Sequence, residues 1–303
     1  MNPPNEIDGT SAAPVIEARG LVKTYGTTKA LDQVDLSIGP GRIVGLIGPN
    51  GAGKTTALKA ILGLAPYEGA LRVLGLNPYT ERARLMQEVC FIADVAVMPR
   101  WLKVRDAVDF VAGVHPRFNR ARAEEFLAKT EIRSGARVKQ LSKGMVTQLH
   151  LALVMAIDAR LLVLDEPTLG LDIIYRKRFY DTLLNDYFVN EDSTEQPRTI
   201  LVTTHQVEEI ENILTDVIFI ARGKIVLDLP MERISERFTQ LVVGADRLND
   251  ALACGPIHKH ETLGRHVLYF ENADRKRLAT LGELHTPGLA DLFFAKLDGG
   301  AGL

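Results

Sequence analysis

The chain has 303 residues, with 36 Lys and Arg against 38 Asp and Glu, a formal net charge of -2 and 46% hydrophobic residues. This is the composition of a globular protein, which excludes a disordered or fibrous chain, and the length favours two domains. Because the charges nearly balance, the composition gives no bulk attraction to nucleic acid, and no nucleic-acid partner is expected.

The cysteine count and the hydropathy pattern both bear on location. Cys90 and Cys254 are the two cysteines, too few for a disulfide framework, which favours a cytoplasmic protein. The first residues show no basic segment followed by an apolar one, so no secretory signal is predicted. The longest apolar run covers residues 151–157, whereas a membrane-spanning helix needs about 20 apolar residues. We therefore expect no membrane span in this chain.

The pattern of apolar residues changes along the chain. A polar lead-in at residues 1–14 is predicted to be flexible. Apolar bursts between turn residues predict strands, and helical periodicity takes over near residue 100 before buried strands return. In chain order we predict strands within 15–38 and at 43–47, a helix at 51–64, a short strand pair near 70–76, a strand at 89–93, helices at 102–114, 120–130 and 142–157, a strand at 161–164, a helix at 175–187, a strand at 199–204 and a hairpin over 217–229.

A different pattern begins after Pro230. Strand-like letters at 241–243 and 266–271, with helices near 247–253 and 288–297, predict a small mixed appendage. It also contains a group of basic and imidazole side chains, His258, Lys259, His260 and His266. Because no Cys or carboxylate spacing accompanies them, we interpret these as surface residues and not as a metal site.

The most informative segment follows the predicted strand at 43–47 and opens the predicted helix. It is a complete G-x-x-x-x-G-K-[ST] motif, Gly48-Pro49-Asn50-Gly51-Ala52-Gly53-Lys54-Thr55, followed by Thr56. Glycines let successive backbone N–H groups point inward, and the helix N-terminus adds positive potential, so the segment predicts a phosphate-binding loop. In such a loop the Lys54 ammonium reaches the β- and γ-phosphates, and the Thr55 hydroxyl ligates Mg²⁺.

Two acids end the apolar run at 161–164. Asp165 is placed where a strand end meets Mg²⁺ beside the phosphate loop, and Glu166 is then positioned to polarise an attacking water as a general base. His205 ends the third apolar burst, TILVTTH, at the same predicted edge. We interpret it as a γ-phosphate sensor that orients the water.

Further motifs narrow the class. Leu141-Ser142-Lys143-Gly144-Met145 resembles the signature of ABC ATPases, with Lys143 and Met145 departing from its commonest letters. Tyr25 matches the aromatic residue that stacks on adenine in that family, Gly170-Leu171-Asp172 its D-loop, and His205 its switch histidine. Residues 15–229 therefore resemble the nucleotide-binding subunit of an ABC transporter.

This resemblance implies a fold and a domain plan. The fold is an α/β P-loop NTPase core (ABC ATPase) with an antiparallel β subdomain and an α-helical subdomain at about 95–157, plus a small α+β C-terminal domain over 230–303. It also implies ATP and Mg²⁺ as ligands. Two ATP-binding subunits, as a homodimer or pseudo-dimer, would face head to tail. Ser142, Lys143 and Gly144 of one copy would then approach the γ-phosphate held by the other.

One departure from the family lies after the predicted strand at 89–93. The family usually has Gln there, and Asp94 takes that place. A carboxylate is a suitable oxygen ligand for Mg²⁺, directly or through water. It offers no amide donor, however, and a loop carboxylate that faces solvent is an equal alternative.

The family also has a membrane partner, which contacts the region just after this departure. Val97, Met98, Trp101 and Leu102 are the corresponding candidate contacts to an integral-membrane permease subunit, with Trp101 as the anchor. The alternative is that these side chains pack the helical subdomain. A permease partner would place this chain in the cytoplasm, peripheral on the inner face of the cell membrane.

The C-terminal segment Leu289-Ala290-Asp291-Leu292-Phe293 resembles the L-x-D-x-F-like helix of subunits that serve ABC-2 type exporters. We therefore expect an ATP-hydrolysing subunit that powers export through a separate membrane protein. The alternative is a soluble ABC ATPase that acts on nucleic acid or ribosomes. A single phosphate loop, the absence of sustained heptads and the balanced charge argue against that alternative.

Overall fold

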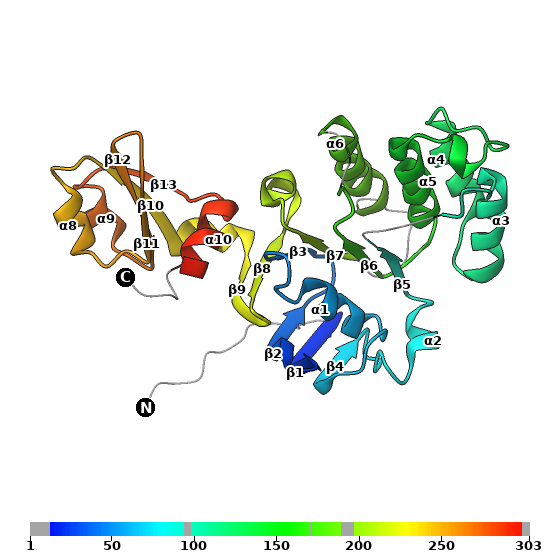
Figure 1. Cartoon of the computed structure of the whole chain (residues 1–303), viewed down its shortest axis with the longest axis horizontal. Coiled ribbons are helices and arrows are strands. Elements are labelled where there is room, and N and C mark those ends of the chain that lie inside the picture. Colours follow the sequence, from blue (N-terminus) through cyan, green and yellow to red (C-terminus); the bar gives the residue numbers. More distant parts are fainter. Residues whose placement is uncertain (1–12, 94–97, 170, 172, 189–196, 299–303) are drawn as a thin grey trace.

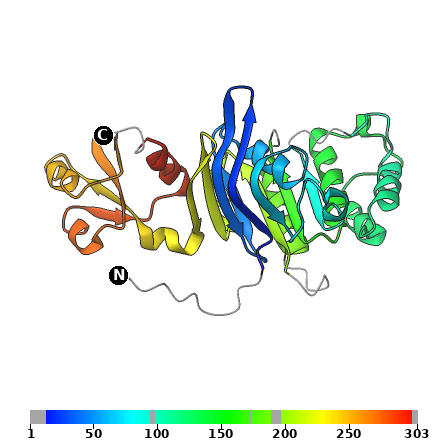
Figure 2. The ribbon, with the colours of Figure 1, turned by 90° about the horizontal axis from the view of Figure 1, so that it is seen from below.

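The structure of this chain is a computed structural model that describes residues 13–93, 98–169, 171, 173–188 and 197–298. The described strands form three sheets (Figure 1). The largest lies in the middle of the molecule, with a helical unit at one end and a smaller sheet at the other, as Figure 2 also shows. The fold confirms the expected α/β P-loop architecture.

The central sheet has the strand order β5-β6-β7-β3-β8-β9. Adjacent strands in this sheet are parallel, except that β8 and β9 are antiparallel to each other. Its strands are β3 (Ile43–Ile47), β5 (Val89–Ile92), β6 (Leu161–Asp165), β7 (Thr199–Thr204), β8 (Asp216–Ala221) and β9 (Lys224–Pro230). Because β3, β6 and β7 are parallel neighbours, the segments that follow them emerge at one edge of the sheet.

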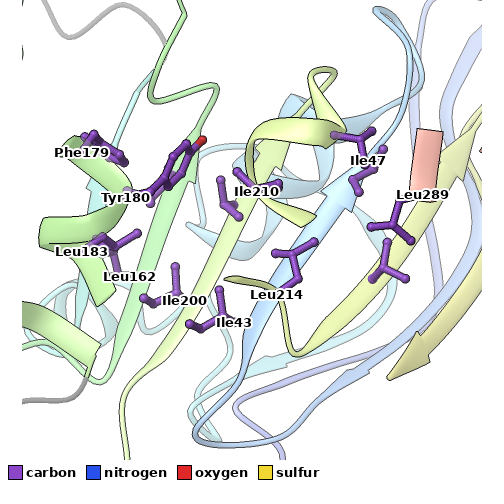
Figure 3. Packing of buried hydrophobic residues seen from close by; sticks show 14 of the residues in the cluster. Ile43, Ile47, Leu162, Phe179, Tyr180, Leu183, Ile200, Ile210, Leu214 and Leu289 are labelled. Atoms are coloured by element: carbon purple, nitrogen blue, oxygen red, sulfur yellow. The ribbon is translucent and has the colours of Figure 1, made fainter. Parts of the chain in front are cut away.

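Both faces of this sheet are covered, which explains its continuous apolar strands. In β3, Ile43 and Ile47 belong to one buried cluster, and Val44 and Leu46 to the cluster on the opposite face. The first cluster packs against α6 (Ile173–Thr182), which continues as a π-helical segment at Leu183–Phe188, and against the C-terminal helix (Figure 3).

The second cluster joins the central sheet to an antiparallel sheet and to α1 (Lys54–Ile61). The antiparallel sheet has the order β2-β1-β4, with β1 (Ile16–Tyr25), β2 (Thr28–Ile38) and β4 (Glu68–Val73). The prediction of a strand pair near 70–76 was wrong. One strand, β4, pairs with β1 across the sheet, and a single bridge from Val73 to Leu76 closes a tight turn after it.

The helical unit comprises α3 (Val104–Val114), α4 (Arg120–Ala128) and α5 (Lys143–Met155). These helices bury a small core of their own, which includes Val104, Val108 and Leu149. A short helix, α2 (Arg82–Leu85), precedes β5. Within the residues that the structure describes, every helix is too short or too polar to span a bilayer.

The C-terminal sheet is antiparallel, with the order β11-β12-β10-β13. Its elements are α7 (Ile234–Arg237), β10 (Phe238–Val243), α8 (Leu248–Leu252), β11 (His258–Thr262), β12 (Arg265–Glu271), α9 (Arg275–Leu278), β13 (Glu283–His285) and α10 (Leu289–Asp298). The sequence did not indicate α7, β11, α9 or β13. We propose that residues 230–303 form an accessory domain, because this sheet has its own buried cluster around Leu241 and Phe270.

Helix α10 nevertheless returns to the central sheet. Leu289, Leu292 and Phe293 belong to the same buried cluster as the central strands, and Figure 3 shows Leu289 from α10 at the edge of that cluster. The ring of Phe293 meets that of Phe219 on β8 edge-on, with centroids 5.1 Å apart. The Leu289 backbone N–H also donates to Glu211 Oε1 at 3.1 Å. The last helix therefore joins the accessory sheet to the central one.

Candidate functional site

An open pocket of about 520 Å³ lies where β3, β6 and β7 end. It brings together the phosphate loop, the paired acids and the histidine that the sequence singled out. Its lining residues are Ala30, Pro49, Asn50, Gly51, Gly53, Lys54, Thr55, Thr56, Asp165, Glu166, Leu169 and His205. Ala52 is buried behind the loop and does not line the pocket.

Two glycines shape the loop between β3 and α1. Gly53 has φ +113°, which L side chains rarely adopt, and a Cβ there would lie 2.4 Å from the carbonyl oxygen of Ala30. A Cβ on Gly48 would lie 2.4 Å from the carbonyl oxygen of Ile220. The neighbouring backbone thus requires glycine at both positions, and the loop closes tightly against β2 and β8.

Lys54 begins α1 and is almost completely buried, with 6% of its surface exposed. Its ammonium donates to the carbonyl oxygen of Gly48 at 2.6 Å and lies 3.4 Å from Glu166 Oε1. A buried cation must be paired, and these oxygens satisfy it. The ammonium is therefore held inside the curve of the loop, where phosphate oxygens would approach it.

Asp165 ends β6 and is buried. Its Oδ1 accepts a 2.6 Å hydrogen bond from the hydroxyl of Thr203 on β7. This bond fixes the carboxylate at the pocket wall. The Asp165 carboxylate and the exposed hydroxyl of Thr55 supply the hard oxygen donors that Mg²⁺ prefers, so the donor set fits that ion.

Glu166 has a strained backbone, with φ +48°. Its N–H donates to both Thr203 O at 3.1 Å and Thr203 Oγ1 at 3.2 Å, which holds the residue against β7. A non-glycine residue kept at positive φ costs of order 1–3 kcal/mol, and such strain clusters at functional sites. Here the strain places the Glu166 carboxylate in the pocket and beside Lys54.

His205 follows β7 and contacts the same carboxylate. Its Nδ1 lies 2.9 Å from Glu166 Oε2. An ionised carboxylate only accepts hydrogen bonds, so this contact places a proton on Nδ1. The pair resembles a base and the group that orients it.

Four residues that are predicted to face the nucleotide or the second copy lie away from the pocket wall. Tyr25 ends β1, is half exposed, and has Lys23 Nζ 5.0 Å from its ring centre. Ser142 caps α5, its Oγ accepting from the Met145 N–H at 3.2 Å, and Lys143 and Gly144 form the first turn. In the described part of the chain, none of these lines the pocket that holds Lys54.

Some predicted residues fall outside the described residues. These are Asp94 and Val97, from the segment after β5, and Asp172, the predicted D-loop aspartate. Their roles stay predictions.

The other candidate partner contacts differ in exposure. Trp101 is 71% exposed, whereas Met98 and Leu102 pack against the core of the helical unit. Two further apolar side chains on α3, Phe110 and Val114, are also largely exposed.

The C-terminal histidines form ring contacts. The ring of His260 stacks on that of Tyr269 with centroids 5.7 Å apart, and the ring of His258 lies 6.0 Å from it. Among the described residues there is no group of three or more His, Cys, Asp or Glu suited to a metal ion. Their interpretation as surface residues stays a prediction.

Sequence reasoning missed three members of the site. Thr203 anchors both acids, and Ala30 and Leu169 line the pocket. The two threonines that end TILVTT were a usable signal, because hydroxyls at the end of a buried strand need partners.

Comparison with known proteins agrees with this geometry. Residues 31–169 match the family model described as ABC transporter. The chain is 32% identical over 310 residues to Nod factor export ATP-binding protein I of Paraburkholderia xenovorans (strain LB400), covering 94% of this chain and 97% of that protein. It is 33% identical over 212 residues to the probable multidrug ABC transporter ATP-binding protein YbhF of Escherichia coli (strain K12), covering 68% of this chain and 35% of that protein.

Solved structures give the same fold. One described as the structure of the ATP binding subunit of an ABC transporter superposes with a TM-score of 0.64 at 22% identity, covering 73% of this chain and 92% of that one.

Proposed function

This chain belongs to the family of ABC transporter ATP-binding proteins, and from that premise we propose residue roles, a partner arrangement and a direction of transport. The chain binds and hydrolyses ATP as the ATP-binding subunit of a transporter. The observation that carries the residue roles is the single pocket that contains Lys54, Asp165, Glu166 and His205.

The phosphates bind in the loop between β3 and α1. Backbone N–H groups and the Lys54 ammonium surround the β- and γ-phosphates, while Tyr25 stacks on the adenine. Thr55 and Asp165 would hold Mg²⁺, which when bound would neutralise charge that develops on the phosphates. Asp94, which lies outside the described residues, stays a candidate oxygen donor to that ion in the place where the family has an amide, with a loop carboxylate that faces solvent as the alternative.

Hydrolysis requires a water in line with the γ-phosphate. Glu166 accepts a proton from this water, and His205 holds the Glu166 carboxylate and orients the water. The 2.9 Å contact between His205 Nδ1 and Glu166 Oε2 supports the assignment of Glu166 as the base and of His205 as the residue that holds it.

A second copy of the ATP-binding subunit completes the site. The exposed Ser142 hydroxyl and the backbone N–H groups of Lys143 and Gly144 in the first turn of α5 offer donors to an anion. We assign them to the γ-phosphate of the opposite copy, with Asp172 at the contact between copies. ATP then holds the two copies together, and hydrolysis releases them.

The membrane partner binds at the helical unit. Trp101 is the anchor, and its exposure, together with that of Phe110 and Val114, supports an apolar contact surface there. Met98 and Leu102 are the neighbouring candidate contacts, although their side chains also pack on the core of the helical unit. The subunit is then peripheral on the cytoplasmic face of the membrane.

We propose export as the direction of transport. A relative that matches almost the whole chain carries the name Nod factor export ATP-binding protein I, and the C-terminal Leu289–Phe293 segment resembles that of exporter subunits.

Affinity purification of the tagged full chain from detergent-solubilised membranes tests the assignment. Recovery of a protein with several membrane-spanning helices, and ATP hydrolysis by the complex, are expected. Recovery of ribosomes or DNA in place of a membrane protein would contradict it.

A further inference from the structure

We propose that Arg176 is a positioning residue for ATP hydrolysis, which holds the Glu166 and His205 segments in register with the segment that precedes Asp172. The proposal rests on the function proposed above and adds to it a residue outside the pocket lining. Arg176 lies on α6 and is not among the described residues that line the Lys54 pocket.

The guanidinium of Arg176 bonds two loops at once. Its Nε donates to the carbonyl oxygen of Leu171 at 2.7 Å. Its Nη1 donates to Gln206 Oε1 at 2.6 Å and to the carboxylate of Glu209. The planar guanidinium offers several donors in a fixed geometry, which suits a residue that must hold separate segments at set distances.

Glu209 extends the connection to a third segment. Its second oxygen, Oε2, accepts from the Thr168 hydroxyl at 3.3 Å, and that hydroxyl also lies 3.4 Å from the hydroxyl of Tyr180 on α6. Thr168 and Tyr180 are both buried, and burial raises the pKa of the Tyr180 hydroxyl well above its usual range. Tyr180 therefore stays protonated and able to donate.

These contacts anchor both members of the catalytic pair. Gln206 directly follows His205, and Thr168 lies two residues after Glu166. The His205–Glu166 contact thus closes a loop of interactions whose far side is the Arg176 guanidinium. A shift of either segment would lengthen the 2.9 Å contact on which base catalysis depends.

The charged side chains of this network are largely shielded from solvent, which strengthens their interaction. The side chains of Arg176 and Glu209 are only 23% and 22% exposed, so solvent screens them less than it screens a surface pair. Removing one partner would leave the other half-buried and uncompensated. We therefore expect the Arg176–Glu209 ion pair to contribute more than an exposed ion pair on the surface of α6 would.

The bond from Arg176 to the Leu171 carbonyl links the network to the segment that precedes Asp172. Leu171 precedes Asp172, the residue assigned to the contact between copies. A second copy that moves this segment would act on Arg176 through the Leu171 carbonyl, and through Arg176 on His205 and Glu166.

Four variants of the full chain test the proposal: Arg176→Gln, Arg176→Lys, Glu209→Gln and, as control, Arg178→Gln, an exposed arginine on the same helix. ATP affinity is measured by titration with a fluorescent ATP analogue, turnover by phosphate release, and folding by thermal unfolding. Misplaced catalytic groups typically lower kcat by ~10- to 100-fold. We expect that loss in Arg176→Gln and Glu209→Gln, with ATP affinity within about threefold of the wild type. Arg176→Lys should recover part of the rate, and Arg178→Gln should match the wild type.

A double variant separates positioning from general damage. Because both groups act through one network, Arg176→Gln combined with Glu209→Gln should be about as slow as the slower single variant, and not slower by the product of the two losses. Multiplicative losses, or equal losses in kcat and in ATP affinity, would overturn the proposal.

The outcomes also separate this proposal from the proposed function. If the wild-type chain hydrolyses ATP and Arg176→Gln does so at the same rate, the positioning role is rejected and the function stands. If the wild-type chain and its membrane complex hydrolyse no ATP, the proposed function itself fails. Should Arg176→Gln not fold, Glu209→Gln decides, because it keeps the size and shape of the side chain.

Discussion

The Nζ of Lys54 lies 3.4 Å from Oε1 of Glu166, and both side chains are largely buried in the same pocket. The group assigned to the phosphates and the group assigned to the water therefore form one ion pair. A substitution at either residue changes the electrostatic surroundings of the other, and the two substitutions have different consequences.

Lys54→Ala should abolish ATP turnover. The substitution removes the cation that faces the β- and γ-phosphates. It also leaves the Glu166 carboxylate without its ammonium partner, and this unpaired negative charge repels the phosphates. Phosphate release by the purified protein measures the effect. Lys59→Ala, an exposed lysine on the same helix, is the control and should retain turnover. Near-normal hydrolysis by Lys54→Ala would refute the site.

Glu166→Gln should keep ATP binding and hydrolyse ATP ~10²–10⁴-fold more slowly, because the amide cannot accept the proton from water. The loss of negative charge beside Lys54 should not weaken phosphate binding. We expect Mg-ATP to hold this variant as a dimer during gel filtration. The exposed Glu208→Gln should behave as the wild type. A monomeric Glu166→Gln with full turnover would contradict the base assignment.

Local patterns predicted the residues that line this pocket well. The phosphate loop was predictable because its glycines, Lys54 and Thr55 are consecutive, and the strand before them has an unmistakable apolar run. Asp165 and His205 were predictable because each ends such a run, and parallel strands end at one edge of a sheet.

Contacts between distant segments were not predictable in the same way. The threonines that end TILVTT indicate that hydroxyls there need partners, but nothing in the neighbouring letters identifies Asp165 and Glu166 as the partners of Thr203. Arg176 lies on α6 and Glu209 follows β7, 33 residues later in the chain, and no spacing rule joins them. The β11 segment, HKHET, is a mostly exposed edge strand, so it carries no apolar alternation.

Trp101→Ala should leave basal ATP hydrolysis intact and weaken the complex with the membrane partner. The side chain is 71% exposed and is not among the described residues of the ATP pocket. Truncating a buried aromatic anchor commonly costs about 2 kcal/mol or more of binding energy. Co-purification of the membrane partner measures this, with the exposed Tyr79→Ala as control. Unchanged assembly together with unchanged transport would defeat the anchor assignment.

The two cysteines should differ sharply in reactivity. Burial raises the pKa of the Cys90 thiol to about 12, so almost no thiolate exists near neutral pH, and the thiolate is the reactive form. Cys254 is partly exposed. Alkylation of the native protein at pH 7.5, followed by mass spectrometry, should modify Cys254 alone, whereas unfolding in urea should make both react. Rapid modification of native Cys90 would show that β5 opens readily.

Phe293→Ala should destabilise the protein by about 3–5 kcal/mol, the range for removal of a buried aromatic ring. The ring is 8% exposed and packs edge-on against Phe219 of the central sheet, so its loss leaves a cavity between α10 and β8. The free energy of unfolding in urea measures the effect. The adjacent Phe294, with 61% of its surface exposed, provides the matched control, and Phe294→Ala should change the stability by less than about 1 kcal/mol.

This comparison tests where α10 packs, because both phenylalanines lie on one helix and differ only in the face they occupy. A helix that packed solely on the C-terminal sheet would leave the β8 side of Phe293 open to solvent. Phe293→Ala and Phe294→Ala would then lower the free energy of unfolding by similar amounts. Neither substitution would change the unfolding of the central sheet, which is followed by the fluorescence of a nucleotide analogue bound in the Lys54 pocket. A large cost for Phe293→Ala that also lowers the urea midpoint of nucleotide release would establish that α10 stabilises the sheet on which the ATP site is built.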